Sequence, residues 1–556
     1  MLALSFRLPV VAIMAATVML PLSIIAYQSV LSEPFFMGGG ALTLDSFRYI
    51  FSDPAFWTAL QNSFGVATGM VLVALPCGAV LAYLLVRTDL PARWLLEPLV
   101  LVPMLIPSIV LGFGYVVAVG PAGFYTQIAR EWLGFAPWNV YSRATITVLA
   151  GLSMVPYVYI YLSTALRSLG SDIEEAARVA GAHPLRVALD VSLPMIFPAI
   201  VFSTVLIFFI GLELFGLPLV LGSPNGFDVL AVYLYKLTNL LGVPSYHLMA
   251  AVVMCLIAMT IPLVFLQRLF LRRAERYVSV RGKGNRSRPV PLGRWRWPIF
   301  AIVAAWITVT ALVPLSGIVI RSFVSHWGVG VNLIEAFTLD TMRQILTDTV
   351  MLRGIVNSVL IGVVGGALAV ACYTLVALAT HRRHDGLSRF VDYLVLVPRG
   401  LPGLVAGLAF LWVFVFFPPL APLRSTLFSV WLAYTVVWLA YGMRLISTSL
   451  VQIGKEVEEA ARSCGASQGR TIRDVTLPLA RNGLLASWLL IFLMFEREYA
   501  TGVYLLTSGT EVIGTLLVTL AETGAMDRAS ALSLVNVVII GIGLGIALRF
   551  GVKIHD

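Results

Sequence analysis

Long runs of apolar residues with almost no charge recur along the chain and limit what it can fold into. Clear examples are residues 8–30, 66–86 and 249–266. About 20 apolar residues are enough for an α-helix to cross the hydrocarbon core of a bilayer. The whole chain is 59% hydrophobic and 12% charged, about half the charge of a typical soluble domain. The sequence therefore predicts an all-α polytopic membrane protein.

We expect about twelve transmembrane helices. The predicted spans are 8–30, 63–86, 96–118, 145–166, 197–220, 246–267, 298–320, 357–380, 391–415, 424–446, 483–506 and 530–550. The first run could be mistaken for a signal peptide, but it lacks an evident small-residue cleavage site and has a counterpart at 298–320. We therefore interpret it as a retained span.

The distribution of basic residues predicts the orientation of the chain. With both termini in the cytoplasm, most of the 38 Lys and Arg residues fall on the cytoplasmic side, as the positive-inside rule requires. The densest cluster, at 268–296, favours an anchor at anionic lipid headgroups, with contact to a cytoplasmic partner as the alternative. The net charge of +10 is thus attributed to the lipid bilayer and not to nucleic acid. The four cysteines form no CxxC pair, so we expect no metal site.

An internal repeat divides the chain. ALTLDSFRYIFSD at 41–53 matches AFTLDTMRQILTD at 336–348, 295 residues later. The same spacing aligns Asn62-Ser63 with Asn357-Ser358, Pro107 with Pro402, and Gly112 with Gly407. We predict a first half (1–275), a basic cytoplasmic linker (276–296) and a second half (297–556). With six spans each, the two halves would run in the same direction and could pack as a pseudo-dimer about an axis along the membrane normal.

The loop between the fourth and fifth spans of each half carries the most specific motif. It reads SDIEEAARVAGAHPLRVALDVSLP at 171–194 and GKEVEEAARSCGASQGRTIRDVTLP at 454–478. The EEAAR runs favour helix, and Gly181 and Gly465 suit left-handed helix ends. A second short helix would follow in each copy. We therefore expect a helix–turn–helix on the cytoplasmic face of each half, which exposes Glu175, Arg178 and Arg186 in the first and Glu459, Arg462 and Arg470 in the second.

These two loops resemble the EAA coupling loop of binding-protein-dependent ABC importer permeases. The resemblance implies a type I ABC importer transmembrane fold with two tandem six-helix permease halves in a bacterial inner membrane. It also implies that each loop binds one of two copies of a separate ATP-binding subunit, and that a periplasmic or extracellular binding protein delivers the solute. The coupling residues carried over are Glu174, Glu175, Ala176, Ala177, Arg178 and Gly181, and then Glu458, Glu459, Ala460, Ala461, Arg462 and Gly465.

The sequence contains no G-x-x-x-x-G-K-[ST] phosphate loop. We therefore expect a transport subunit that is not an enzyme and holds no cofactor, with ATP and Mg²⁺ bound by the partner. A six-plus-six secondary transporter would show the same spans, but it would not need paired EAA loops. A membrane-embedded enzyme is disfavoured because the spans contain no paired His ligands, nucleophile elbow or acidic metal motif. His381 and His384 are attributed to a solvated basic turn.

The substrate is less constrained. LVRTDLPAR at 85–93 and FIGLELFGLPLVLG at 209–222 resemble the ferric-iron branch of the family, in which both halves are fused. This resemblance implies ferric iron as the solute, with thiamine or 2-aminoethylphosphonate as alternatives. The long outer loops, 31–57 and 321–353, offer a surface for the binding protein.

Ionisable residues at membrane depth are candidates for the translocation path, because their burial is costly without a purpose. Carboxylates would suit a hard cation and arginines an anion, whereas a buried ion pair between the halves is the structural alternative. The candidates are Glu213, Arg399, Glu496, Arg497 and Glu498.

Overall fold

The computed structural model describes residues 4–38, 40–169, 171–239, 245–274, 289–327, 331–383, 385–398 and 402–549. Within these ranges the secondary structure is helical apart from isolated β-bridges. Eight helices in the described part are long and apolar enough to cross a membrane, or up to ten if each of two bent pairs counts as one span. The all-α polytopic prediction is confirmed. Ten of the twelve predicted spans overlap these helices and bent pairs; the other two, 246–267 and 391–415, fall on the helix Tyr246–Ala274 and on the helices Gly386–Leu396 and Gly403–Phe416.

The principal helices of the two halves follow the predicted spans. In the first half they are α1 (Leu4–Ser29), α3 (Pro54–Arg87), α4 (Arg93–Leu105), α5 (Ser108–Val119), α7 (Arg143–Ser168), α11 (Phe197–Leu212) and α13 (Tyr246–Ala274). In the second half they are α14 (Arg296–Ile307), α15 (Val313–Ser322), α17 (Thr349–Leu360), α18 (Gly366–Thr380), α19 (Gly386–Leu396), α20 (Gly403–Phe416), α21 (Leu427–Val437), α22 (Leu439–Val451), α25 (Leu477–Arg497) and α27 (Met526–Arg549).

Short helices connect these elements at both ends of the molecule. They include α2 (Asp45–Ser52), α6 (Phe124–Leu133), α8 (Ser171–Val179), α9 (Pro184–Val187), α10 (Leu193–Met195) and α12 (Leu230–Asn239). Their second-half companions include α16 (Asp340–Thr347), α23 (Lys455–Ser463), α24 (Gln468–Thr471) and α26 (Ile513–Thr523).

Two of the predicted spans are interrupted at a proline. The predicted span 96–118 is two helices, α4 and α5, and the predicted span 391–415 is α19 and α20. Pro107 and Pro402 precede α5 and α20 with extended backbone, at ψ values of 141° and 140°. Proline lacks an N–H group and disfavours helix at the residue before it. The repeat-matched prolines therefore mark interruptions of an otherwise apolar segment.

The repeated Asn-Ser pairs hold equivalent backbone segments. Asn62 donates a hydrogen bond to the carbonyl of Asp228 (2.8 Å), and the Ser63 hydroxyl accepts one from the amide of Leu230 (2.7 Å). In the second half, Asn357 donates to the carbonyl of Glu511 and the Ser358 hydroxyl accepts from the amide of Ile513, both at 2.8 Å, where the backbone leads into α26. Leu230 and Ile513 are buried, and buried backbone must have its polar groups satisfied inside the protein. The pair recurs in the sequence because both halves need this contact at the start of α12 and α26.

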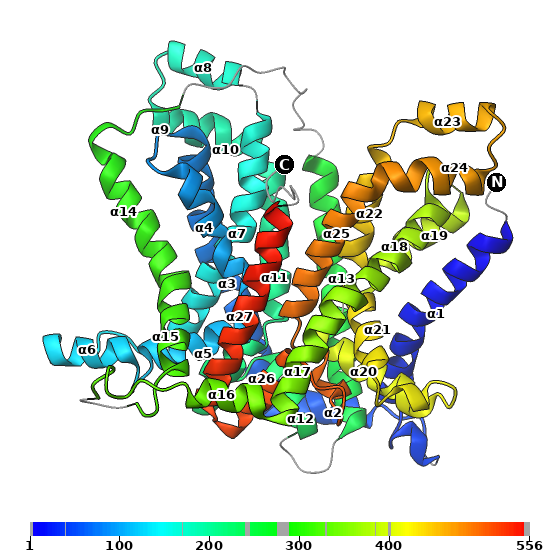
Figure 1. Ribbon diagram of the computed structural model, residues 1–556, viewed down its shortest axis with the longest axis horizontal. Coiled ribbons are helices and arrows are strands. Elements are labelled where there is room, and N and C mark those ends of the chain that lie inside the picture. The colour runs from blue at the N-terminus through cyan, green and yellow to red at the C-terminus, as the bar shows by residue number, and fades with distance from the viewer. Residues whose placement is uncertain are drawn as a thin grey trace.

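The first span of each half also packs against the other half. α1 contacts α18 and α20 as well as α13, and α15 contacts α5 as well as α27. The buried Arg7 of α1 pairs with Asp385 at 2.7 Å and donates to the carbonyl of Ala379 at 2.8 Å. The Arg7 guanidinium holds the pKa of the Asp385 carboxyl well below its usual range. The two sets of helices are therefore interlocked (Figure 1).

The connecting helices separate into two groups at opposite ends of the molecule. Figure 1 shows α8 and α23 at one end, and α2, α12 and α16 at the other. The N-terminal end of α1 and the C-terminal end of α27 lie at the same end of the molecule as α8 and α23. The predicted linker lies mostly outside the described residues, and the division into halves at 275 and 297 stays a prediction.

Candidate functional site

The EEAAR segments form the predicted helix–turn–helix in both copies. α8 leads through Gly181 (φ +88°) to α9, and α23 leads through Gly465 (φ +87°) to α24. The amide of Ala182 donates to the carbonyl of Ala177 (3.0 Å), and that of Gly181 to Arg178 (2.9 Å). The second copy repeats both bonds at 3.1 and 2.9 Å. Paired bonds of this kind define a helix end that requires a left-handed residue, so the prediction for both glycines is confirmed.

The outer surface of each motif is formed by acidic, basic and small residues. Exposed side chains or backbone positions are Glu175, Ala176, Gly181 and Arg186 in the first copy, and Glu459, Ala460, Arg462, Gly465 and Arg470 in the second. Ala177 and Ala461 are half-buried. Arg178 is less exposed than predicted, because its guanidinium turns toward Glu174 at 3.6 Å. We call these two surfaces the coupling surfaces.

Two of the predicted coupling residues point away from these surfaces. Glu174 and Glu458 are buried, at 2% and 5% exposure. Glu174 lies 3.1 Å from Nε of Arg87, and Glu458 lies 3.4 Å from Nη1 of Arg382. The prediction grouped them with the exposed glutamates, whereas the structure directs their carboxylates into their own half. Sequence reasoning missed both arginines, although they share the 295-residue spacing of the repeat.

His381 departs from its predicted environment. It was expected in a solvated turn, but its side chain is only 14% exposed and its Nε2 lies 3.3 Å from a carboxylate oxygen of Glu458. Burial lowers the pKa of His381, more than the neighbouring carboxylate raises it. The imidazole therefore contributes a hydrogen bond to this buried group at neutral pH. His384 lies outside the described residues.

The charged residues predicted at membrane depth lie where helices end. α11 ends at Leu212, directly before Glu213, and α25 ends at Arg497, directly before Glu498. The Glu498 carboxylate accepts hydrogen bonds from the amides of Ala500 (3.2 Å) and Thr501 (3.0 Å). It also accepts from the Thr501 hydroxyl (2.9 Å) and the Trp438 indole (3.2 Å). Glu498 thus satisfies backbone donors that the helix break leaves free.

The remaining path candidates have different environments. Glu496 is 4% exposed, and neither of its carboxylate oxygens has a hydrogen-bond partner among the described residues. Its Oε1 lies 2.7 Å from where a Cβ atom on Gly362 would be, so it packs directly against the α17–α18 span. Arg497 and Glu213 are half-buried. Arg399 lies outside the described residues. The structure therefore divides one predicted charge cluster into groups with separate surroundings.

The break after α11 and the break after α25 meet through an aromatic pair that sequence reasoning missed. Phe215 and Tyr499 stack with ring centroids 6.2 Å apart and an interplanar angle of 11°. The Tyr499 hydroxyl contacts the hydroxyl of Ser108 at 2.6 Å and accepts from the amide of Gly216 at 3.1 Å. The signal was available, since both aromatics occupy the same repeat position, 284 residues apart. Second-half Tyr499 therefore stabilises the break in the first half.

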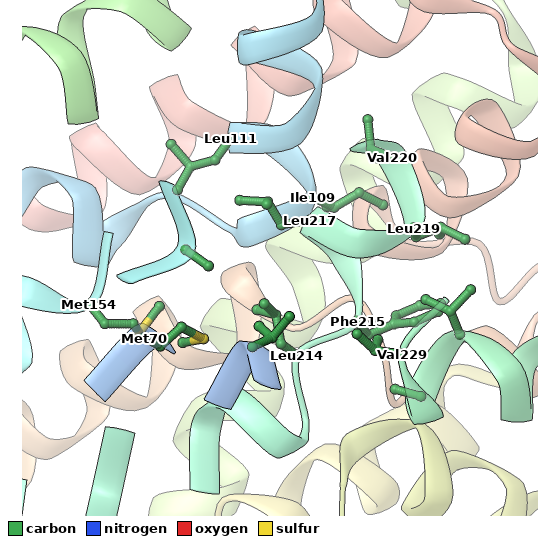
Figure 2. Packing of buried hydrophobic residues seen from close by; sticks show 14 of the residues in the cluster. Met70, Ile109, Leu111, Met154, Leu214, Phe215, Leu217, Leu219, Val220 and Val229 are labelled. Carbon is green, nitrogen blue, oxygen red and sulfur yellow. The ribbon is translucent and has the colours of Figure 1, made fainter. Parts of the chain in front are cut away.

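The first-half break is packed closely against α5. Figure 2 shows Phe215 beside Val229, with Ile109 and Leu217 close together above them. A Cβ atom on Gly216 would lie 2.8 Å from the backbone nitrogen of Ile109. Glycine at this position lets the broken chain approach α5 directly.

A polar pocket lies at the end of the molecule opposite the coupling surfaces. Its volume is about 580 Å³, and its lining includes Arg321, Asp340, Asp527 and Arg528. Arg321 and Asp527 form an ion pair within it. The pocket joins α15 and α16 to the α26–α27 turn, inside the outer region that the sequence predicted as a partner surface.

Comparison with known proteins gives a family match. A model described as "Binding-protein-dependent transport system inner membrane component" matches residues 74–276 and 373–556. The chain is 24% identical over 444 residues to the ferric transport system permease protein FbpB of Actinobacillus pleuropneumoniae, covering 79% of this chain and 63% of that protein. It is 25% identical over 419 residues to a putative ferric transport system permease protein FbpB 1 of Haemophilus influenzae, covering 74% and 64%. The chain thus spans slightly less than two thirds of the length of these two relatives.

Other similarities are shorter or weaker. The molybdenum transport system permease protein ModB of Escherichia coli is 32% identical over 167 residues, which is 30% of this chain and 72% of that protein. Among solved structures, a bacterial ABC transporter involved in the import of the acidic polysaccharide alginate matches with a TM-score of 0.40 and 21% identity. That match covers 47% of this chain and 92% of the other.

Proposed function

Because the chain belongs to the family of binding-protein-dependent transport system inner membrane components, we propose that it is the membrane-spanning permease subunit of an ATP-driven importer. The observation that carries this proposal is the pair of coupling surfaces at one end of the molecule (Figure 1). Each has the same helix, the same left-handed glycine and the same outward glutamate. Each surface would bind one copy of a separate ATP-binding subunit, which hydrolyses ATP.

The chemistry of the coupling surfaces suits a protein interface. Ala176 and Ala460 are exposed and small, so a partner backbone can come close to the helix. Glu175 and Glu459 are exposed beside them and can pair with basic groups across the contact. Charged groups at the edge of an interface fix its register and exclude wrong partners. Closure of the two ATP-binding subunits would therefore be transmitted to both halves through equivalent contacts.

The orientation follows from the same assignment. The coupling surfaces would face the cytoplasm, and the N-terminal end of α1 and the C-terminal end of α27 lie on that side (Figure 1). The pocket formed by α15, α16 and the α26–α27 turn would then face outward. We propose that this outer end receives a solute-binding protein.

Ferric iron is the solute that we propose. Two relatives named as ferric transport permeases match 79% and 74% of the chain. The shorter similarity to a molybdenum permease covers 30% of the chain and makes an oxyanion the second candidate. The fused arrangement of two halves supports the ferric branch, and thiamine and 2-aminoethylphosphonate are the other solutes to be compared.

The double substitution Glu175→Lys/Glu459→Lys tests the coupling surfaces. We expect it to reduce co-purification of the ATP-binding subunit by roughly tenfold or more, since about 1.4 kcal/mol of lost binding energy is enough. The matched control is Asp45→Lys/Asp340→Lys, a repeat-related pair of exposed acidic residues in α2 and α16 at the opposite end. Equal recovery of the ATP-binding subunit with wild type and the coupling variant would contradict the proposed contact.

The substrate is tested by ATP-dependent uptake into proteoliposomes. The vesicles would contain the chain with its ATP-binding subunit, and the binding protein would be added outside with radioactive ferric iron. We expect uptake of iron that unlabelled ferric iron reduces and that molybdate, thiamine and 2-aminoethylphosphonate do not. Accumulation of molybdate and not iron would overturn the ferric assignment while leaving the permease role intact.

A further inference from the structure

In each coupling motif a buried glutamate pairs with an arginine at the end of a span in the same half. We propose that Arg87 and Arg382 are positioning residues, which lock the coupling helices to the ends of two spans and so transmit ATP-driven movement. This inference rests on the proposed function, because it concerns how the coupling surfaces move the spans. It assigns the buried glutamates Glu174 and Glu458 to force transmission and not to contact with the partner.

In the first half, one guanidinium joins three elements. Arg87 is the last residue of α3 and is 5% exposed. Its Nε lies 3.1 Å from Oε1 of Glu174 in α8, and its Nη2 donates to the carbonyl of Leu166 in α7 at 2.9 Å. Glu174 also accepts a hydrogen bond of 2.8 Å from Ser192, beyond α9. Both arms of the helix–turn–helix are therefore fastened to the ends of α3 and α7.

The second half makes the same connections with different local geometry. Arg382 follows α18 in a left-handed conformation (φ +54°). Its Nη1 lies 3.4 Å from Oε2 of Glu458, and its Nη2 donates to the carbonyl of Ile453, just after α22, at 2.6 Å. Glu458 accepts from Thr476 at 3.2 Å. The acid, the arginine, the span-end carbonyl and the hydroxyl all recur, although the backbone that presents the arginine differs.

The doubled glutamate follows from helix geometry. Neighbouring residues on an α-helix point about 100° apart, because one turn takes 3.6 residues. Glu174 is directed inward to Arg87 while Glu175 is exposed on another side of α8, and the same holds for Glu458 and Glu459 in α23. One glutamate of each pair is placed to hold the helix, and the next is placed to meet the partner.

The ion pair also explains why the connection would be stiff. The carbonyls of a last helical turn lack helix partners and attract positive charge. Each arginine serves a buried carboxylate together with a backbone carbonyl, that of Leu166 in the last turn of α7 or that of Ile453 just beyond α22, with a planar fork that lysine cannot reproduce. Without it, the carboxylate would be a buried charge that has lost its basic partner, and α8 would be joined to α7 mainly through the chain between them.

The test is the ratio of solute transported to ATP hydrolysed in the reconstituted importer. For Arg87→Met/Arg382→Met we expect the ATP-binding subunits to co-purify and to hydrolyse ATP, while transport per ATP falls at least fivefold. Glu174→Gln/Glu458→Gln is a second test that remains available if the arginine variant fails to fold. It removes the charge but keeps the hydroxyl contacts, and it should give the same uncoupling. Arg87→Lys/Arg382→Lys should recover the ratio only in part.

Arg167→Met is the matched control. Arg167 pairs with Glu97 at 3.0 Å and joins α7 to α4 in the same region, but the pair is 38% and 25% exposed. We expect its transport per ATP to equal that of wild type. An unchanged ratio in the arginine and glutamine variants would overturn the inference, whereas failure of wild type to bind an ATP-binding subunit would instead refute the proposed function.

Discussion

Replacing Gly407 by alanine is expected to destabilise the second half strongly. A Cβ atom at this position of α20 would lie 2.1 Å from the carbonyl oxygen of Thr501 and 3.0 Å from its carbonyl carbon. Thr501 is fixed in turn, because Glu498 accepts hydrogen bonds from both its amide and its hydroxyl. The backbone must therefore shift, and overpacking of this kind costs on the order of 3 kcal/mol. Thermal unfolding in detergent should show a clearly lower midpoint and a low yield of monodisperse protein.

Two other glycines provide graded controls. Gly112 is the repeat counterpart of Gly407, but its added Cβ would meet the Val220 side chain at 3.0 Å, so we expect a smaller loss. Gly545 in α27 has no heavy atom within 4 Å of its added Cβ. Alanine there should be neutral or stabilising by up to about 1 kcal/mol through helix propensity. Equal midpoints for the Gly407 and Gly545 variants would contradict the close contact with Thr501.

Helices with an uninterrupted apolar sequence were predicted well. The expected span 145–166 corresponds to α7 at Arg143–Ser168, because hydrophobic length and the helix-capping Ser142 both act locally. The breaks were not predicted, since apolar residues continue on both sides of Pro107 and Pro402. Whether such a proline merely kinks or ends a helix depends on the neighbours that satisfy the freed backbone. Next to Pro107, the hydroxyl of Ser108 contacts the hydroxyl of Tyr499, from the other end of the chain, at 2.6 Å.

The candidate site shows the same limit. The turns at Gly181 and Gly465 were predictable because glycine and helix propensity decide them locally. Sequence pattern could not separate Glu174 from Glu175, because the partner that turns one inward, Arg87, is on a different span. Residues at matching repeat positions were the signal that could have revealed it, as they could have revealed the stacked Phe215 and Tyr499.

Single replacements of the two glutamates at the end of α25, Glu498 and Glu496, should have sharply different effects on stability. Glu498→Ala would leave the amides of Ala500 and Thr501 and the Trp438 indole without their acceptor. A buried donor that loses its partner costs about 1–3 kcal/mol, so we expect a loss of at least about 3 kcal/mol together with loss of transport. Glu498→Gln should be intermediate, since one amide oxygen can still accept but its nitrogen cannot serve the indole.

Glu496→Gln is the contrasting variant at the same helix end. Its carboxylate has no hydrogen-bond partner in the described part of the chain, and an unpaired buried carboxylate is unfavourable. A neutral amide of the same size should therefore leave the unfolding midpoint unchanged or raise it. Uptake measurements then distinguish a carboxylate of the translocation path from a structural one. A stable Glu496→Gln protein with altered transport would support a pathway carboxylate, because its fold is intact. Marked destabilisation of Glu496→Gln, or full stability of Glu498→Ala, would contradict this assignment of roles.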